Sequence, residues 1–119
     1  MHLTCKYFIA YFSAVDSDLV FKALADLTRR RLLDNLRACN GQSLSELCKT
    51  SRLTRQAVSL HLARLEDANL VTTVRRGREK LHYLNPVPIH QIYERWIRHY
   101  EWKHLEALRD VKERAERSS

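Results

Sequence analysis

Apolar positions recur with a helical period between residues 54 and 67. Each residue of a helix turns by about 100°, so Val58, Leu62 and Leu65 share one face and form a buried stripe. The opposite face carries small or polar residues and one leucine: Gln56, Leu60, Ala63 and Asp67. We therefore predict one amphipathic helix here, with its second face left bare.

Residues suited to helix ends flank this stretch. Thr54 can accept a backbone N–H as an N-cap, and Asn69 tolerates the left-handed conformation that stops a helix. Upstream, Ser43 and Glu46 have the spacing of a capping box for a short helix over 44–50. Two such helices, joined by a short turn, predict a helix-turn-helix.

Two β-prone runs follow, at 70–74 and 79–84. The Arg-Arg-Gly-Arg segment between them allows a tight turn, because Gly77 can adopt a positive φ. A bare helix face followed by a hairpin with a cationic tip is the pattern of a winged helix-turn-helix, and it indicates DNA reading.

Two further helices are predicted before the capping box. Asp16, Ser17 and Asp18 offer polar acceptors and negative charge for the start of the first one. The second is expected from about Thr28 to Cys39, where Asn40 and Gly41 end it. Its arginines are expected to point outward, more as a solvated face than as phosphate contacts: Arg29, Arg30, Arg31 and Arg37.

The pattern changes again at Pro86, after which one helix is predicted from about Ile89 to Glu116. Its apolar and aromatic stripe is too long for a small body to cover, so part of it is expected to pack on a second copy of the chain. The interface residues predicted from this stripe are Ile92, Trp96, Tyr100, Leu105 and Leu108.

Residues 1–15 have the least interpretable pattern. Packing of their aromatic residues on the body or on a second subunit is favoured over a free extension, because exposed aromatics are a liability. The sequence has no clear charged leader and no cleavage pattern, so a signal peptide is not indicated. The predicted organisation is thus an extension at 1–15, a DNA-binding domain at 16–85 and a dimerisation helix at 86–119.

The distribution of charge supports this organisation. The formal net charge is +7, and residues 52–80 alone contribute +4, from seven Lys/Arg and three Asp/Glu. Positive charge is therefore concentrated on the helix and hairpin that would approach a polyanion. A generally basic protein without such a partner would spread the excess more evenly.

The remaining composition narrows the class of protein. The three cysteines, Cys5, Cys39 and Cys48, are odd in number and form no close pair, which favours a reducing cytoplasm over a disulfide framework. No run has the roughly 18–20 apolar residues of a membrane helix. The sequence contains no phosphate-binding loop and no matched set of catalytic residues, so an enzyme is not indicated. No cofactor is expected.

Three stretches occur in the order and with the spacing of a known family: VFKALADLTRRRLLDNL, SLSELCKTSRLTRQAVSLHLARLEDANLV and VRRGREKLHYLNPVPI. Together, within roughly residues 18–100, they resemble the ArsR family of winged-helix repressors. The resemblance implies a homodimer that occupies and represses a promoter operator. It implies a mainly α fold with a two-stranded β wing, dimerising through its terminal helices, with 54–67 in the major groove.

Several positions depart from the family pattern. Leu27 stands where the family often has Pro, and Asn69 where it often has Gly; both replacements suit a helix boundary. Metal-sensing members carry a cysteine pair in the helix before the turn, whereas here Cys48 is alone. The histidines and carboxylate near the last helix also lack the family's metal spacing: His90, His99, Glu101 and His104. A metal sensor is therefore the less favoured alternative.

The DNA contacts are expected from the leading turns of helix 54–67 and from the hairpin. Arg55 can pair with guanine and Gln56 with adenine, while Leu60 either reads a thymine methyl or makes a weaker contact. His61 lies closer to the buried face, so packing or a phosphate contact is favoured for it. The full predicted set is Thr54, Arg55, Gln56, Ser59, Leu60, Ala63, Arg64, Arg75, Arg76, Arg78 and Lys80. For Arg75 and Lys80 a solvated strand position is an equal alternative.

Two rival functions remain open on the sequence. A winged-helix protein-interaction module would use the basic surface for acidic partners, but the small Ser59 and Ala63 beside Gln56 favour close approach to a groove. RNA binding is less favoured, because the aromatic residues cluster in the predicted dimer stripe and not on a stacking surface. The effector, if one exists, is unknown.

Overall fold

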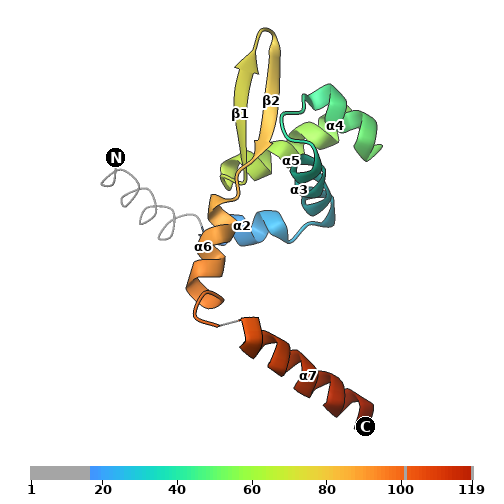
Figure 1. Cartoon of the computed structure of the whole chain (residues 1–119). Coiled ribbons are helices and arrows are strands. Elements are labelled where there is room, and N and C mark those ends of the chain that lie inside the picture. The colour runs from blue at the N-terminus through green and yellow to red at the C-terminus, as the bar shows by residue number, and fades with distance from the viewer. Residues whose placement is uncertain (1–16, 101, 119) are drawn as a thin grey trace, which may run out of the picture. The chain divides into compact units, whose positions relative to one another are not determined.

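The computed structural model describes residues 17–100 and 102–118 (Figure 1). The elements in chain order are α2 (Ser17–Leu24), α3 (Leu27–Ala38), α4 (Leu44–Ser51), α5 (Arg55–Asp67), β1 (Val71–Arg76), β2 (Glu79–Leu84), α6 (Val87–Trp96) and α7 (Trp102–Ser118). Contacts divide the chain into one compact unit that ends at Ile89 and a second that begins at His90. The predicted mainly helical fold with a two-stranded wing is confirmed.

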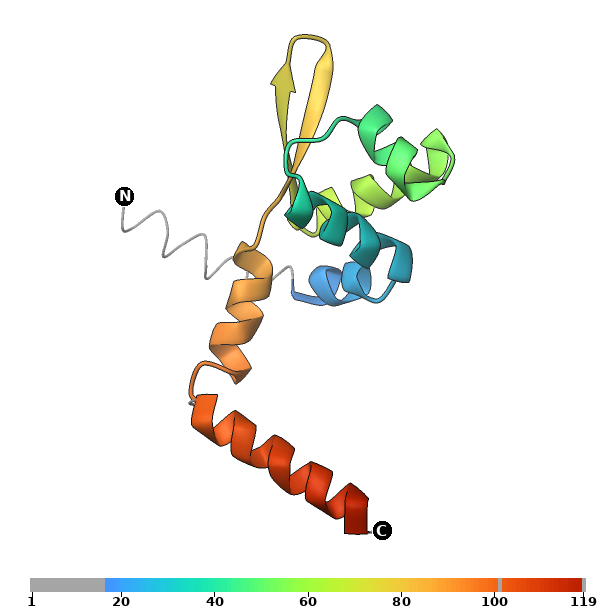
Figure 2. The same cartoon turned by 45° about the vertical axis from the view of Figure 1, so that its right-hand side comes forward.

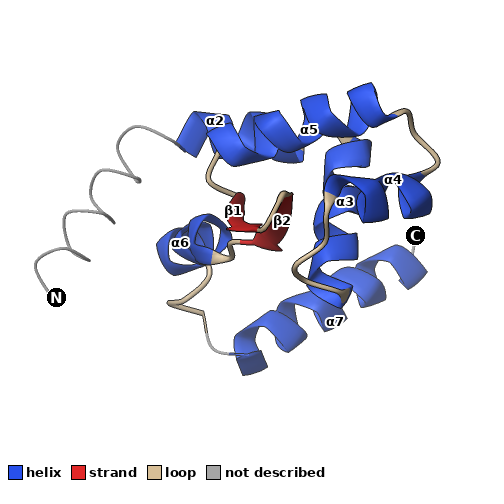
Figure 3. Ribbon diagram, turned by 90° about the horizontal axis from the view of Figure 1, so that it is seen from above, coloured by secondary structure: helices blue, strands red, loops and turns tan. Residues whose placement is uncertain are grey.

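Helices α3 and α5 together form the centre of the first unit. Helix α3 contacts α2, α4 and α5, and it also contacts β2 of the hairpin, while α5 contacts β1 (Figure 3). The apolar stripe predicted for α5 is confirmed, because Val58, Leu62 and Leu65 are all buried. The other large, fully buried side chains come from α2, α3, α4, the turn before β1 and the start of α6: Val20, Leu32, Leu36, Leu47, Leu70 and Pro88.

The predicted helix ends of the helix-turn-helix are confirmed. The hydroxyl oxygen of Thr54 accepts the N–H of Ala57 at 3.1 Å, which caps α5. Ser43 and Glu46 form the reciprocal capping box of α4. Figure 2 shows α4 and α5 joined by a short turn. Arg52 ends α4 with a φ of 59°. This left-handed conformation is uncommon for a long side chain, so the turn carries local strain.

The residues predicted to have positive φ at the ends of α5 and the wing also match. Asn69 has a φ of 59° just after α5, and Gly77 has a φ of 66° in the hairpin turn. Leu27 is the first residue of α3, a position that favours proline because its N–H has no partner within the helix. Both departures from the family pattern therefore preserve the helix-boundary chemistry.

The prediction that all the arginines of α3 point outward is wrong for Arg29. Its side chain is only 18% exposed, and it donates to the carbonyl oxygens of Ala23 at 2.8 Å and Lys22 at 3.1 Å. Arg30 donates to the carbonyl oxygen of Leu24 at 2.6 Å. The last carbonyls of a helix lack partners within the helix, so these guanidinium groups satisfy the end of α2.

Asp26 connects α2 to α3 as the N-cap of α3. Its carboxylate accepts the backbone N–H of Arg29 at 3.0 Å. This hydrogen bond lowers the pKa of Asp26 below its ordinary value, with the positive charge of Arg29 acting in the same direction. The predicted start of this helix, at about Thr28, did not include this cap.

The base of the wing is fixed by a polar contact. The N–H of His82 donates to the carbonyl oxygen of Gln42 at 2.8 Å, and the His82 ring Nδ1 lies 2.9 Å from the same oxygen. A carbonyl can only accept, so Nδ1 carries the proton. The buried Gln42 side chain donates in turn to the Cys39 carbonyl and to Asn35 of α3. This network joins β2 to the C-terminal end of α3.

The second unit differs from the single helix predicted from Ile89 to Glu116. Helix α6 ends at Trp96, and α7 begins at Trp102. At the break, the Tyr93 carbonyl accepts N–H groups from both Ile97 and Arg98. Aromatic and β-branched residues gather here and have weaker helix propensity than the Glu, Lys and Leu of α7. No helix within residues 17–100 or 102–118 is long and apolar enough to cross a membrane.

Leu65 and Leu60 provide a matched pair for measuring what holds α5. Leu65 is fully buried and Leu60 is 58% exposed on the same helix. We expect Leu65→Ala to lower the free energy of unfolding by about 2–5 kcal/mol, because it leaves a cavity in the core. Leu60→Ala should change it by less than about 0.5 kcal/mol. Urea unfolding followed by circular dichroism measures both, and equal losses would contradict this burial pattern.

Candidate nucleic-acid interface

The face of α5 opposite the core is open. Seven of the eleven residues predicted to contact DNA lie on α5 or at its N-cap, and all seven are exposed: Thr54, Arg55, Gln56, Ser59, Leu60, Ala63 and Arg64. The sequence from Arg55 to Ala63 contains no acidic residue, whereas Asp67 lies near the far end of the same face. A polyanion is therefore best accommodated along the first two turns.

A shallow hollow of about 530 Å³ lies along these turns, between α5 and the start of α4. Its lining combines two leucines with small and polar side chains: Leu44, Arg55, Gln56, Ser59, Leu60 and Ala63. Because Ser59 and Ala63 are short, another molecule can approach the helix backbone closely. The hollow brings together five of the predicted contact residues with Leu44, which is not among the predicted contacts.

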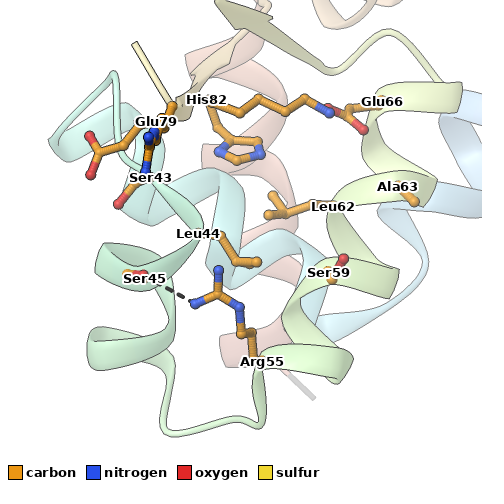
Figure 4. A pocket seen from close by; sticks show the side chains of 12 residues that line it. Ser43, Leu44, Ser45, Arg55, Ser59, Leu62, Ala63, Glu66, Glu79 and His82 are labelled. Carbon is orange, nitrogen blue, oxygen red and sulfur yellow. Dashed lines mark hydrogen bonds and ion pairs between the residues drawn. The ribbon is translucent and has the colours of Figure 1, made fainter. Parts of the chain in front are cut away.

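Arg55 is oriented by the preceding helix. Its Nη1 donates to the hydroxyl of Ser45 on α4 at 3.2 Å, and Figure 4 shows the guanidinium lying between the two helices. This role of Ser45 was not apparent from the sequence pattern, because the two residues lie on different helices. The bond restricts the long Arg55 side chain, so less rotamer freedom remains to be lost when it meets a partner.

A second recess of about 480 Å³ lies between α4, α5 and β2 (Figure 4). Lys80 from the wing forms an ion pair there with Glu66 of α5, with the two charged atoms 3.1 Å apart. Lys80 is therefore partly neutralised from within the chain, in contrast to the arginines at the tip. The sequence left two alternatives for Lys80, a DNA contact or a solvated strand position. The structure matches neither of them simply, because the charged group of Lys80 is paired within the chain.

The hairpin register places positive charges opposite one another. Arg75 faces Lys80 across the strands, and Arg76 faces Glu79. Like charges directly opposite each other destabilise a sheet, so the ion pair of Lys80 with Glu66 offsets part of this repulsion. Arg78 is exposed in the turn and forms no ion pair with any described residue. The tip of the wing is therefore a concentrated positive charge.

His61 belongs to the body of the protein. Its Nδ1 lies 3.4 Å from Nη1 of Arg29, and its side chain is half-buried. Of the two roles considered for this residue, packing is the one that its surroundings support. The Arg29 guanidinium, which binds the carbonyl oxygens at the end of α2, therefore also contacts α5 through His61.

The potential metal ligands are dispersed. Cys39 is exposed and Cys48 is half-buried, and both are free thiols. Within residues 17–100 and 102–118, no three His, Cys, Asp or Glu side chains lie close enough together to hold a metal ion. His90 instead pairs with Glu94 on the next turn of α6, at 3.4 Å. Glu101 lies outside the described residues.

Comparisons with known proteins agree with this geometry. A family model described as a helix-turn-helix domain matches residues 24–74. An HTH-type transcriptional regulator of Bacillus subtilis, YuzN, is 42% identical over 90 residues, which cover 69% of this chain and 96% of that protein. The structure of an ArsR-like regulator from a Rhodococcus species matches with a TM-score of 0.64 and 26% identity, over 89% of this chain and 93% of that one. The chain belongs to the ArsR family.

A further structural match shows how widely the fold is shared. The transcriptional repressor PagR of Bacillus anthracis matches with a TM-score of 0.60, over 71% of this chain and 95% of that one, at 20% identity. This ArsR-family protein is thus a DNA-binding transcriptional regulator with a winged helix-turn-helix. The exposed face of α5 and the cationic wing are the surfaces of the first unit that suit this activity.

Proposed function

We propose that this ArsR-family regulator is a homodimeric repressor that binds an operator with inverted-repeat symmetry. Helix α5 enters the major groove, and the hairpin β1–β2 lies along the flanking backbone or minor groove. The observation that carries the proposal is the asymmetry of α5. Its inner face is buried, while its outer face is acid-free over the first two turns and adjoins a cationic wing.

The side chains divide into two groups by what they can recognise. Arg55 can form a bidentate contact with guanine, and Gln56 with adenine, so these two specify sequence. Ser59 and Arg64 are placed for a base edge or a phosphate. Arg75, Arg76 and Arg78 extend from the wing, where charge attracts any DNA equally. Lys80 contributes less to this attraction because Glu66 already pairs with it.

The homodimer is proposed from the second unit. Trp96 is 49% exposed, and Tyr100 and Leu108 are exposed by half or more. Ile92 and Leu105 are half-buried. Large apolar side chains left in water to this extent in one short segment are typical of a surface that meets another chain. Ile92 and Trp96 lie on α6, Leu105 and Leu108 lie on α7, and Tyr100 lies in the break between the two helices.

The experiment that tests the proposal is a nuclease footprint on DNA upstream of the protein's own gene. A two-fold dimer places its reading helices about one DNA turn apart, roughly 34–36 Å, so protection should cover an imperfect inverted repeat. Protection of a single asymmetric half-site would contradict the dimer. Loss of protection on adding random-sequence DNA would contradict specific reading and would favour the protein-interaction module.

Substitutions in α5 and in the wing should have different effects on binding. Gln56→Ala should weaken operator binding by about 1–3 kcal/mol and leave random DNA nearly unaffected, because a base contact is lost. Arg78→Ala should weaken both DNAs alike and flatten the plot of log K against log salt by about 0.9, the value for one lost phosphate contact. Fluorescence anisotropy across a salt series measures both effects.

Lys80→Ala serves as the matched control on the same hairpin. Because Lys80 already pairs with Glu66, its removal should leave the salt slope nearly unchanged. A slope change equal to that of Arg78→Ala would show that Lys80 leaves Glu66 to bind a phosphate. Equal losses on operator and random DNA for Gln56→Ala would contradict the assignment of sequence reading to α5.

Trp96 and Trp102 allow the proposed interface to be tested with one chemical change. Sedimentation velocity at micromolar concentration should show the wild-type chain as a dimer. Trp96→Glu should shift it to monomer, because a carboxylate would be buried in an apolar contact. Trp102→Glu, at a more exposed tryptophan outside the proposed set, should remain dimeric. A folded wild-type monomer would rule out the interface, and circular dichroism checks that each variant keeps its helices.

A further inference from the structure

We propose that Leu60, together with Leu44, forms an apolar contact for the 5-methyl group of a thymine in the operator. The inference rests on the proposed function, because it assigns a base to part of the reading face of α5. It also identifies Leu60 as a specificity-determining residue, where its exposure alone would suggest a neutral surface position.

The position of Leu60 is the first observation. Its side chain is 58% exposed, although it lies on a helix whose other leucines, Leu62 and Leu65, are buried. One turn away on the same face is Gln56, and Ala63 follows. Leu60 is therefore directed to the same side as the proposed adenine reader and does not belong to the core.

The second observation is the shape of the surface around it. Leu60 and Leu44 are the only large apolar side chains that line the hollow, and Arg55, Gln56 and Ser59 complete the lining with Ala63. The major-groove edge of an A·T pair presents an acceptor, a donor and a methyl group side by side. A polar amide next to a small apolar surface matches that combination.

Charge and size argue against a protein as the occupant of this hollow. Protein-binding hot spots are typically built from aromatic or arginine anchors in desolvated pockets, surrounded by further apolar contacts. Here only two leucines are present, and the charged side chain that lines the hollow, Arg55, is cationic. A single methyl group on a polyanion fits both the small apolar area and the positive surroundings.

The helix geometry also restricts where the thymine lies. Gln56 and Leu60 are four residues apart, which is about 6 Å along the helix axis. Successive bases on a strand are about 3.4 Å apart. The thymine should therefore lie within about two base pairs of the base that Gln56 contacts, and once in each half-site.

The test uses thymine analogues in a duplex that the full-length protein has enriched from a random-sequence library. Each thymine is replaced in turn by deoxyuridine, which lacks only the 5-methyl group and keeps every hydrogen-bonding atom. Loss of one buried methyl contact should weaken binding about fourfold for each half-site. We expect the wild-type protein to show this loss at one thymine per half-site.

The variant Leu60→Ala completes the experiment. It should bind the thymine duplex as weakly as the wild type binds the uracil duplex, with no further loss on the uracil duplex. Arg76→Ala is the control, because it should weaken binding to both duplexes and keep the full difference between them. Leu60 is exposed, so its replacement by alanine leaves the core unchanged.

The outcomes separate this inference from the proposed function. Enrichment of a specific sequence with no thymine sensitive to methyl loss would overturn the role of Leu60 and leave the repressor proposal intact. Retention of the full thymine preference by Leu60→Ala would do the same. Failure of the wild-type chain to enrich any sequence would overturn both proposals.

Discussion

The burial of one face of α5 is the constraint on which the rest of the first unit depends. Val58, Leu62 and Leu65 must be covered, and α5 packs against α2, α3, α4 and β1. A helix fixed on one side cannot rotate to hide its other side. The exposure of Gln56, Leu60 and Ala63 is therefore a consequence of packing, and the proposed reading surface is held in place by the core beneath it.

A second, polar constraint positions the wing. A two-stranded hairpin is marginal by itself in water, so it needs support from its surroundings. The buried pair of Gln42 and His82 provides it by joining β2 to the end of α3 through hydrogen bonds. Because buried polar groups are costly when unpaired, this junction favours one placement of the hairpin base. The tip, which carries the arginines, is exposed to solvent.

The accuracy of sequence reasoning varied with how local each signal was. The caps at Thr54 and Ser43 and the positive φ at Asn69 and Gly77 follow from interactions within a few residues, and all were predicted correctly.

Arg29 was misjudged because its partners belong to the preceding helix, across a turn whose geometry the hydrophobic period does not reveal. The ion pair of Lys80 with Glu66 depends on how the hairpin meets α5, so strand alternation alone did not indicate it. The break after Trp96 was missed because an apolar stripe can continue across a turn.

The ion pair between Glu66 and Lys80 affects how strongly the protein would bind non-specific DNA sites. Every additional uncompensated cation strengthens binding to all sequences, and ordinary sites outnumber an operator by about a millionfold or more. By holding Lys80 at 3.1 Å, Glu66 withdraws one positive charge from that competition without altering the residues proposed to face the bases. In a chain that searches DNA, such an internal counter-charge favours rapid release from incorrect sites. Glu66 would then influence how many molecules are free to find the correct one.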